Sequence, residues 1–178
     1  MPGVSFDLPK SWVSCDDATD KLLGNNPDAH NFRSNICNVS TEYKFRGFNP
    51  ILFRTMSMLI EQHEKQDISA QDLDAITPDV ATTISPQVCK TVVEPLTKDG
   101  ATVDSCEMTV GTFAGHKALH SIVIAVPPSG KPEYKYQIDI FELPYSQGYL
   151  QVQFNSPVMF KPTTKPEMDS IIASFKIE

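Results

Sequence analysis

Alternating apolar and polar residues dominate the second half of the chain, and this pattern constrains the fold more than any other feature. Period-two alternation is typical of strands with one buried face and one solvated face. It runs through four stretches, at 102–110, 116–126, 134–143 and 148–155. The last two are separated by four residues, 144–147, and meet at Gly148, which predicts a hairpin. This half of the chain is therefore expected to form a mostly antiparallel sheet.

The first half of the chain mixes strand and helix signals. Alternation predicts strands at 3–8 and 35–45, and the polar, turn-rich stretch 13–34 between them is expected to be a loop or a small insertion. In the strand at 35–45, one face is more apolar than the other, which indicates one solvated face. Residues 174–177 are expected to close the chain as a short strand.

Several helices are predicted from starting signals and apolar stripes. An asparagine–proline pair opens a helix over 51–66, although the apolar content also allows a strand at 51–56. Shorter helices follow over 69–76 and 86–94, the second opened by a serine–proline pair and ended by the next proline. A capping-box pattern, threonine followed three residues later by glutamate, opens the last helix over 164–173. Together with the strands, these helices predict a single α+β domain over residues 1–178, an antiparallel sheet with helices packed on its faces.

Composition narrows the functional classes and the compartment. The chain has 15 basic and 22 acidic residues, a net charge of −7, which argues against a nucleic-acid-binding protein. No apolar run approaches the roughly 20 residues of a membrane-spanning helix. No signal peptide is evident at Met1. The protein is therefore expected either to be cytoplasmic or to have lost a leader and to be periplasmic or secreted.

The four cysteines have two interpretations, buried free thiols or two disulfides with three possible connectivities. If the strand at 3–8 pairs antiparallel with the one at 35–45, Cys15 and Cys37 become neighbours. Cys89 lies on the core face of a predicted helix, and Cys106 lies at an inward position of the strand that follows. We therefore predict the disulfides Cys15–Cys37 and Cys89–Cys106. Disulfides would indicate a compartment outside the cytoplasm.

Candidate catalytic residues are few. His116 and His120 share one strand face but lie about 13 Å apart at ~3.3 Å per residue, which is too far to share one metal ion. On a helix the same spacing would suit zinc, so a metal-dependent hydrolase remains an alternative. His63 and Glu64 lack the second histidine of a zinc-protease motif. No cofactor and no metal site is predicted.

The polar outward face of the last hairpin is a candidate protein-contact surface. One strand carries Phe141 on this predicted face, and the next carries Tyr149, Gln151 and Gln153. A polar face with two aromatic residues suits a protein partner. It also suits plain solvent, or cover by a helix.

Three short blocks resemble the PsbP-like family. Residues 3–9 with Trp12 resemble its G-x-S-F-x-L-P-x-x-W opening. Residues 111–118 are similar to the stretch before the central strand, and 171–176 to the closing helix with its S-F ending. The resemblance implies an α-β-α sandwich around an antiparallel sheet. It also implies a binding or assembly role, since the family shares no catalytic residues.

These observations favour a non-enzymatic binding or assembly factor of the bacterial cell envelope, whose partner is another protein. A cytoplasmic adaptor chaperone that holds apolar helices of a secreted client is the first alternative. A metal-dependent hydrolase using His116 or His120 is the second. Fold resemblance does not choose among these roles.

Overall fold

The computed structural model describes residues 1–16, 27–38, 43–50, 56–64, 69–128, 130, 134–146 and 148–178. Within these residues, seven strands form an antiparallel sheet in the order β2-β3-β4-β8-β7-β6-β5, and β1 and β9 form a separate pair. The strands are β1 (Val4–Ser5), β2 (Val13–Ser14), β3 (Phe45–Phe48), β4 (Ser57–His63), β5 (Thr102–Phe113), β6 (His116–Val126), β7 (Tyr136–Tyr145), β8 (Gly148–Pro157) and β9 (Lys176–Ile177). The helices are α1 (Pro27–Cys37), α2 (Ala70–Ala75), α3 (Pro78–Lys98), the 3₁₀ turn η3 (Val158–Phe160) and α4 (Lys161–Ser174).

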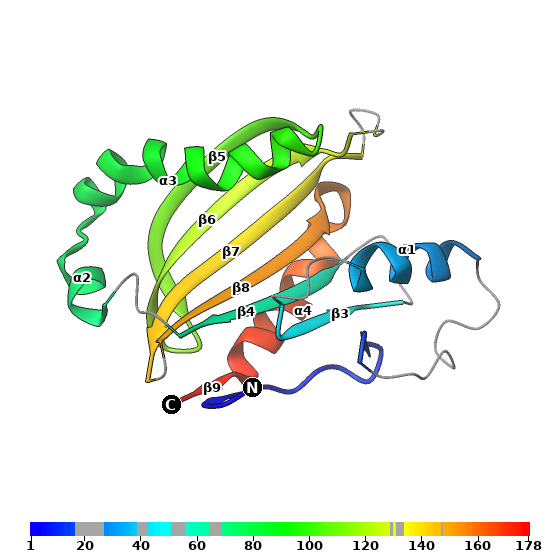
Figure 1. Cartoon of the computed structure of the whole chain (residues 1–178), viewed down its shortest axis with the longest axis horizontal. Coiled ribbons are helices and arrows are strands. Elements are labelled where there is room, and N and C mark those ends of the chain that lie inside the picture. The colour runs from blue at the N-terminus through cyan, green and yellow to red at the C-terminus, as the bar shows by residue number, and fades with distance from the viewer. Residues whose placement is uncertain are drawn as a thin grey trace.

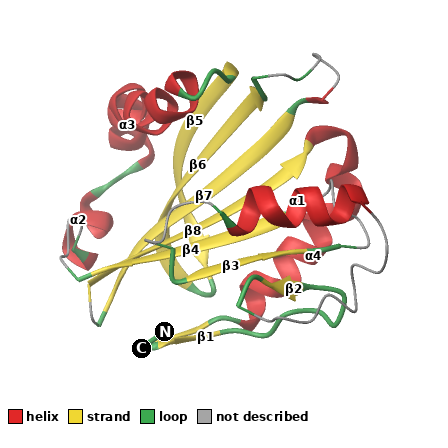
Figure 2. Cartoon of the chain, turned by 45° about the vertical axis from the view of Figure 1, so that its right-hand side comes forward, coloured by secondary structure: helices red, strands yellow, loops and turns green. Residues whose placement is uncertain are grey.

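The predicted α+β architecture is confirmed: helices lie on both faces of the sheet. In Figures 1 and 2, α4 lies behind the sheet and α1 lies in front of it, while α3 runs along β5 at the top. The four long strands β5 to β8 lie where alternation predicts them. None of the described helices is long and apolar enough to cross a membrane.

The largest core cluster lies between the sheet and α4. Strand alternation sends every second residue of β4, β7 and β8 to this side. The fully buried side chains include Met58, Ile60, Leu143, Leu150 and Phe154. Smaller clusters lie under α2 and α3 on the other face, so both faces of the sheet are packed.

The predicted strand at 35–45 is wrong over the part that the structure describes. Helix α1 runs to Cys37, and the strand β3 begins at Phe45; residues 39–42 lie outside the described residues. The stretch 13–34 is more ordered than predicted, since it holds β2 and most of α1. Pro27 is the first residue of α1, where its missing N–H costs nothing.

The helix predicted over 51–66 is also wrong, because residues 57–63 form β4. This strand is hydrogen-bonded to β3 on one side and to β8 on the other. Its residues Ser57 to Ile60 are buried on both faces of the sheet. A continuous apolar run therefore serves an interior strand here. The alternative strand was expected over 51–56; of these residues only Met56 is described, and it directly precedes β4.

Helix α2 forms as predicted, with a complete capping box between Ser69 and Asp72. The next helix is longer than predicted, because α3 runs unbroken through Pro86 and Pro95. The Ser85 side chain does not cap a helix: its Oγ accepts a hydrogen bond from the backbone N–H of Met108 on β5, at 3.0 Å. Apolar packing and a disulfide hold α3 on the sheet, which offsets the backbone hydrogen bonds that the prolines remove.

The predicted capping box of the last helix is absent. Helix α4 begins three residues earlier, at Lys161, and Thr164 lies inside it with its hydroxyl donating to the Phe160 carbonyl at 3.2 Å. The Glu167 carboxylate instead accepts hydrogen bonds from Trp12 Nε1 at 2.7 Å and from Asn49 Nδ2 at 2.9 Å. These buried donors need an acceptor, and Glu167 supplies one.

The chain ends pair with each other rather than with the predicted neighbour. The strand expected over 3–8 is limited to β1, which pairs antiparallel with β9 and not with the 35–45 region. Phe6 then stacks on Phe175 with ring centroids 4.7 Å apart. Figure 1 shows the two termini side by side below the sheet.

The structure contains both predicted disulfides. Cys15 is bonded to Cys37 and Cys89 to Cys106, and the described residues include no free cysteine. The strand pairing that motivated the first bond does not exist. The bond instead joins the residue after β2 to the last residue of α1, while the second joins α3 to β5.

Candidate functional site

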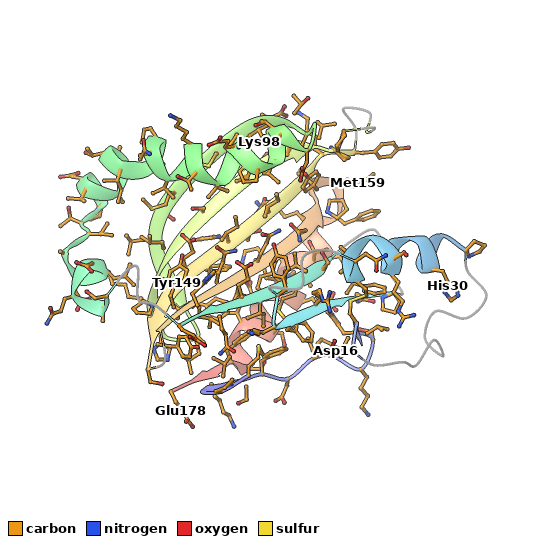
Figure 3. The ribbon with its side chains drawn as sticks, in the orientation of Figure 1. Asp16, His30, Lys98, Tyr149, Met159 and Glu178 are labelled. Carbon is orange, nitrogen blue, oxygen red and sulfur yellow. A yellow bond between two sulfur atoms is a disulfide. The ribbon has the colours of Figure 1, made fainter. Side chains whose placement is uncertain are left out.

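A cleft of about 650 Å³ lies between α4 and the sheet, on the face opposite α3. Its floor is formed by β6 and β7, and one turn of chain between β5 and β6 closes one end. Helix α4 forms its wall, because β8 ends beside Met159 and the chain then turns back over the sheet. Figure 3 shows Met159 at the opposite end of β8 from Tyr149. The volume lies in the range of small-molecule and cofactor sites.

A chain of hydrogen bonds crosses the polar end of the cleft. Lys161 Nζ donates to Gln137 Oε1 at 3.0 Å, and Gln137 Nε2 donates to Asp139 Oδ2 at 2.7 Å. Asp139 Oδ1 lies 2.9 Å from His120 Nε2. Gln137 and Asp139 are 7% and 3% exposed, and their buried polar atoms are satisfied by these hydrogen bonds. The three strand residues are therefore held in fixed positions.

His120 lines the cleft, and one of its two ring nitrogens is hydrogen-bonded to Asp139. A carboxylate oxygen only accepts, so Nε2 carries the proton shared with Asp139, and in the neutral ring Nδ1 is then an acceptor. Within the described residues, Nδ1 has no hydrogen-bond partner. The ring is stacked on Phe141, with centroids 4.1 Å apart and planes 13° apart. Stacking and the bond to Asp139 together set the direction in which Nδ1 points.

The other end of the cleft is more apolar. Met168 and Ile172 line it from α4, and Phe141 lines it from β7. The cleft is closed here by the tight turn at Ala114 and Gly115, which have positive φ values of 52° and 84°. The site is thus polar at the start of α4 and apolar towards its end.

The predicted protein-contact surface is divided between the two faces of the sheet. Phe141 is paired with Val152, so it faces α4 and the cleft, whereas Tyr149, Gln151 and Gln153 face the other way. Tyr149 is also buried, at 7% exposed. The four residues therefore do not form one surface. The prediction placed Phe141 on the same face as Gln151 and Gln153, and the observed register differs from it by one residue, which moves Phe141 to the other face.

The residues on the face opposite the cleft bond mainly to one another. Gln153 Nε2 donates to Asn155 at 2.8 Å, and Asn155 Nδ2 donates to Ser57 at 3.2 Å. Gln151 Nε2 lies 3.4 Å from Glu61 Oε2, and Glu61 also contacts His63 at 3.3 Å. These side chains therefore already use many of the hydrogen-bond donors and acceptors that a protein partner would need on this face.

Glu142 on this face makes stability depend on pH. Burial raises the pKa of Glu142, while the hydrogen bond to Tyr149 and the charge of His63 oppose that rise. The folded state therefore holds the proton more tightly than the unfolded chain, so stability falls as pH rises above the unfolded value of about 4.5. We expect Glu142→Gln to be more stable than wild type at pH 7, with the difference vanishing near pH 4. Urea unfolding at a series of pH values measures this.

Glu107→Gln, an exposed position on β5, is the matched control and should leave the curve unchanged. A Glu142→Gln variant that loses stability equally at every pH would contradict the assignment, since it would show that the carboxylate contributes contacts independent of its ionisation.

The two candidate metal histidines lie apart and have different surroundings. His116 is exposed at the start of β6, whereas His120 lies four residues further along the strand and is paired with Asp139. Among the residues that the structure describes, no three His, Cys, Asp or Glu side chains come close enough together to hold a metal ion. His120 therefore belongs to the cleft, and His116 does not line it.

Sequence reasoning missed the cleft as a site. Gln137, Asp139 and Phe141 stand out as alternate positions of one strand, but a polar alternate face is also what a solvated strand shows. One signal could have indicated the site. Ile138 and Ile140 suggest a strand that is covered on both faces, and such strands keep few charged residues, so an aspartate at position 139 is unusual there.

The described part of the chain has an antiparallel sheet with α4 on one face and α1 to α3 on the other, and its termini pair with each other. Comparison with solved structures shows that this fold is PsbP-like. The chain superposes on cyanobacterial PsbP (CyanoP) from Synechocystis sp. PCC 6803 with a TM-score of 0.50 and 16% identity, over 99% of this chain and 87% of that one. It superposes on LpqN of Mycobacterium tuberculosis with a TM-score of 0.51 and 11% identity, over 99% and 86% of the two chains.

At the level of sequence, no protein family and no curated protein matches the chain. The likeness is therefore one of fold. The resemblance read from residues 3–12, 111–118 and 171–176 is confirmed as a PsbP-like fold.

Proposed function

We propose that this protein is a non-enzymatic binding factor of the bacterial cell envelope, and that it binds its partner in the cleft beside α4. The observation that carries the proposal is the cleft itself. It combines a fixed polar end, from Lys161 to His120, with an apolar end at Met168 and Ile172. Sites of this size and mixed lining are typical of specific ligand recognition.

The envelope location rests on two supports. Two disulfides persist best outside the reducing cytoplasm. LpqN, which shares the fold, is described as involved in cell envelope biogenesis. The cytoplasmic adaptor chaperone fits less well, because apolar client helices would cover the cleft's polar groups without satisfying them.

The test places a photo-crosslinking amino acid at Ala173, an exposed α4 residue that lines the cleft. Ser170 on the same helix is exposed and does not line the cleft, so it is the matched control. In the native host, we expect a discrete crosslinked product from position 173 and not from position 170. Equal products, or none, from both positions would contradict binding in the cleft. Fractionation of the same cells shows whether the product is in the envelope.

A second candidate function is hydrolysis, favoured by the His120–Asp139 pair, because a carboxylate that orients a histidine is how enzymes position a general base. His120→Ala distinguishes the two. A hydrolase would lose turnover of an ester substrate and its pH profile, whereas a binding protein would show no turnover above that of free imidazole in either form.

A further inference from the structure

The lining of the cleft indicates the chemistry of its occupant, and this inference rests on the proposed binding function. We propose that the cleft binds the C-terminal end of an extended peptide segment of a partner protein. The terminal carboxylate lies at Lys161, and the preceding residues run along α4 towards the turn at Gly115.

Among the described residues that line the cleft, Lys161 is a cation that no carboxylate pairs with. The Asp169 carboxylate is paired with Lys165 at 2.6 Å, and the Asp139 carboxylate is held by His120 and Gln137. Lys161 donates to the neutral amide of Gln137, and no described carboxylate pairs with it. Its remaining N–H groups are therefore available for an anionic group at the mouth of the cleft, and a carboxylate forms the stronger, charge-assisted hydrogen bond there.

The length of the cleft matches a short peptide. Lys161 and Ala173, which line its two ends, are twelve residues apart on α4. At 1.5 Å per residue this is about 18 Å of helix. An extended chain rises about 3.3 Å per residue, so about five residues span the same distance. A single amino acid or a small anion would occupy only the polar end.

The distribution of polar groups favours a peptide over a hydrocarbon chain. Polar side chains line the cleft from its Lys161 end to its middle, with Thr164 near that end and Asp139 and His120 in the middle. A hydrocarbon chain would remove them from water without replacing their hydrogen bonds. A peptide carries an N–H and a C=O at every residue, and His120 Nδ1 can accept one of these N–H groups. Met168 and Ile172 then contact apolar side chains of the peptide.

The test uses a pool of fluorescein-labelled pentapeptides with apolar residues at alternate positions, in free-carboxylate and C-terminally amidated forms. Anisotropy with the disulfide-bonded full chain measures binding, and ¹⁵N NMR shifts locate it. We expect the free-carboxylate pool to bind at least about tenfold more tightly than the amidated pool. Lys161→Gln should abolish this difference. Lys90→Gln, at an exposed position of α3 on the opposite face of the sheet, should retain it.

Three results would overturn the proposal. Equal binding of both pools would show that the protein does not recognise the terminal carboxylate. NMR shifts confined to the sheet face that carries Gln151 would show that the peptide does not bind in the cleft. Binding of laurate, a simple long-chain carboxylate, without binding of either pool would identify the occupant as an amphiphile instead of a peptide. In each case a crosslink specific to position 173 would still support the proposed function, so the two failures are distinguishable.

Discussion

Replacing Gly148 by alanine is expected to destabilise the protein by about 3–5 kcal/mol, the sum of severe overpacking and of a backbone conformation that side chains disfavour. Gly148 begins β8 with a φ of +142°. A Cβ at this position would overlap the carbonyl oxygen of His63, the last residue of β4, and would lie 3.0 Å from the carbonyl carbon of Glu64. Neither backbone atom can move without disturbing the pairing of β4 with β8.

The matched control is Gly115→Ala. Gly115 has a φ of +84°, but a Cβ there meets no atom within 4 Å. This variant should therefore lose only the conformational term, about 1–2 kcal/mol. Urea unfolding followed by circular dichroism gives both values. Equal losses in the two variants would contradict the close approach of β4 to the start of β8.

Removing the Cys89–Cys106 disulfide as a pair of alanines is expected to cost about 3 kcal/mol in the free energy of unfolding. The bond closes a loop with a sequence separation of 17, and freeing a loop of this length increases the entropy of the unfolded chain by about that amount. The bond also ties α3 to β5, an edge strand of the sheet. Few residues of α3 are buried, since Ala81 is the one fully buried residue described in it.

Hydrogen exchange distinguishes local loosening of α3 from a loss of stability of the whole protein. Amides of α3 should lose protection in the Cys89→Ala, Cys106→Ala variant, while those of β7 and β8, deep in the sheet, should change only with global stability. The Cys15→Ala, Cys37→Ala pair has a similar separation of 22 and should cost a similar amount without affecting α3. Unchanged stability in the first variant would contradict a structural role for the bond.

The cysteine pairs show how a correct prediction can rest partly on wrong geometry. Cys89 and Cys106 lie on a helix and on the next strand, as predicted, and elements consecutive in sequence are usually adjacent in space. Cys15 and Cys37 were paired through strands that do not pair. In the structure they meet because α1 packs against Phe48 and Val13, which β3 and β2 supply. Sequence proximity limited the choices more than the assumed topology did.

The cleft could be predicted less well than the sheet. Alternation identifies the strands β5 to β8, and it places Gln137, Asp139 and Phe141 on one face. It does not identify which face is covered, because a shift of one residue in register exchanges the two faces. Lys161 and Met168 join the site only because α4 turns back across the sheet after β8.

The sequence alone determined the local features of this protein: the long alternating strands, the capped helix α2, the Cys89–Cys106 pair and the α+β class. Each depends on neighbours within about twenty residues, through side-chain periodicity, capping or loop closure. Only the tertiary structure decided that residues 57–63 are a strand and that a cleft opens beside α4. It also decided that the Glu167 carboxylate accepts a hydrogen bond from Trp12 instead of capping its own helix. The strand and the Glu167 hydrogen bond depend on partners 90 or more residues away, Gln151 opposite Glu61 and Trp12 beside Glu167, and the cleft joins Lys161 of α4 to Gln137 of β7, 24 residues away. Their burial free energy outweighs the local preference.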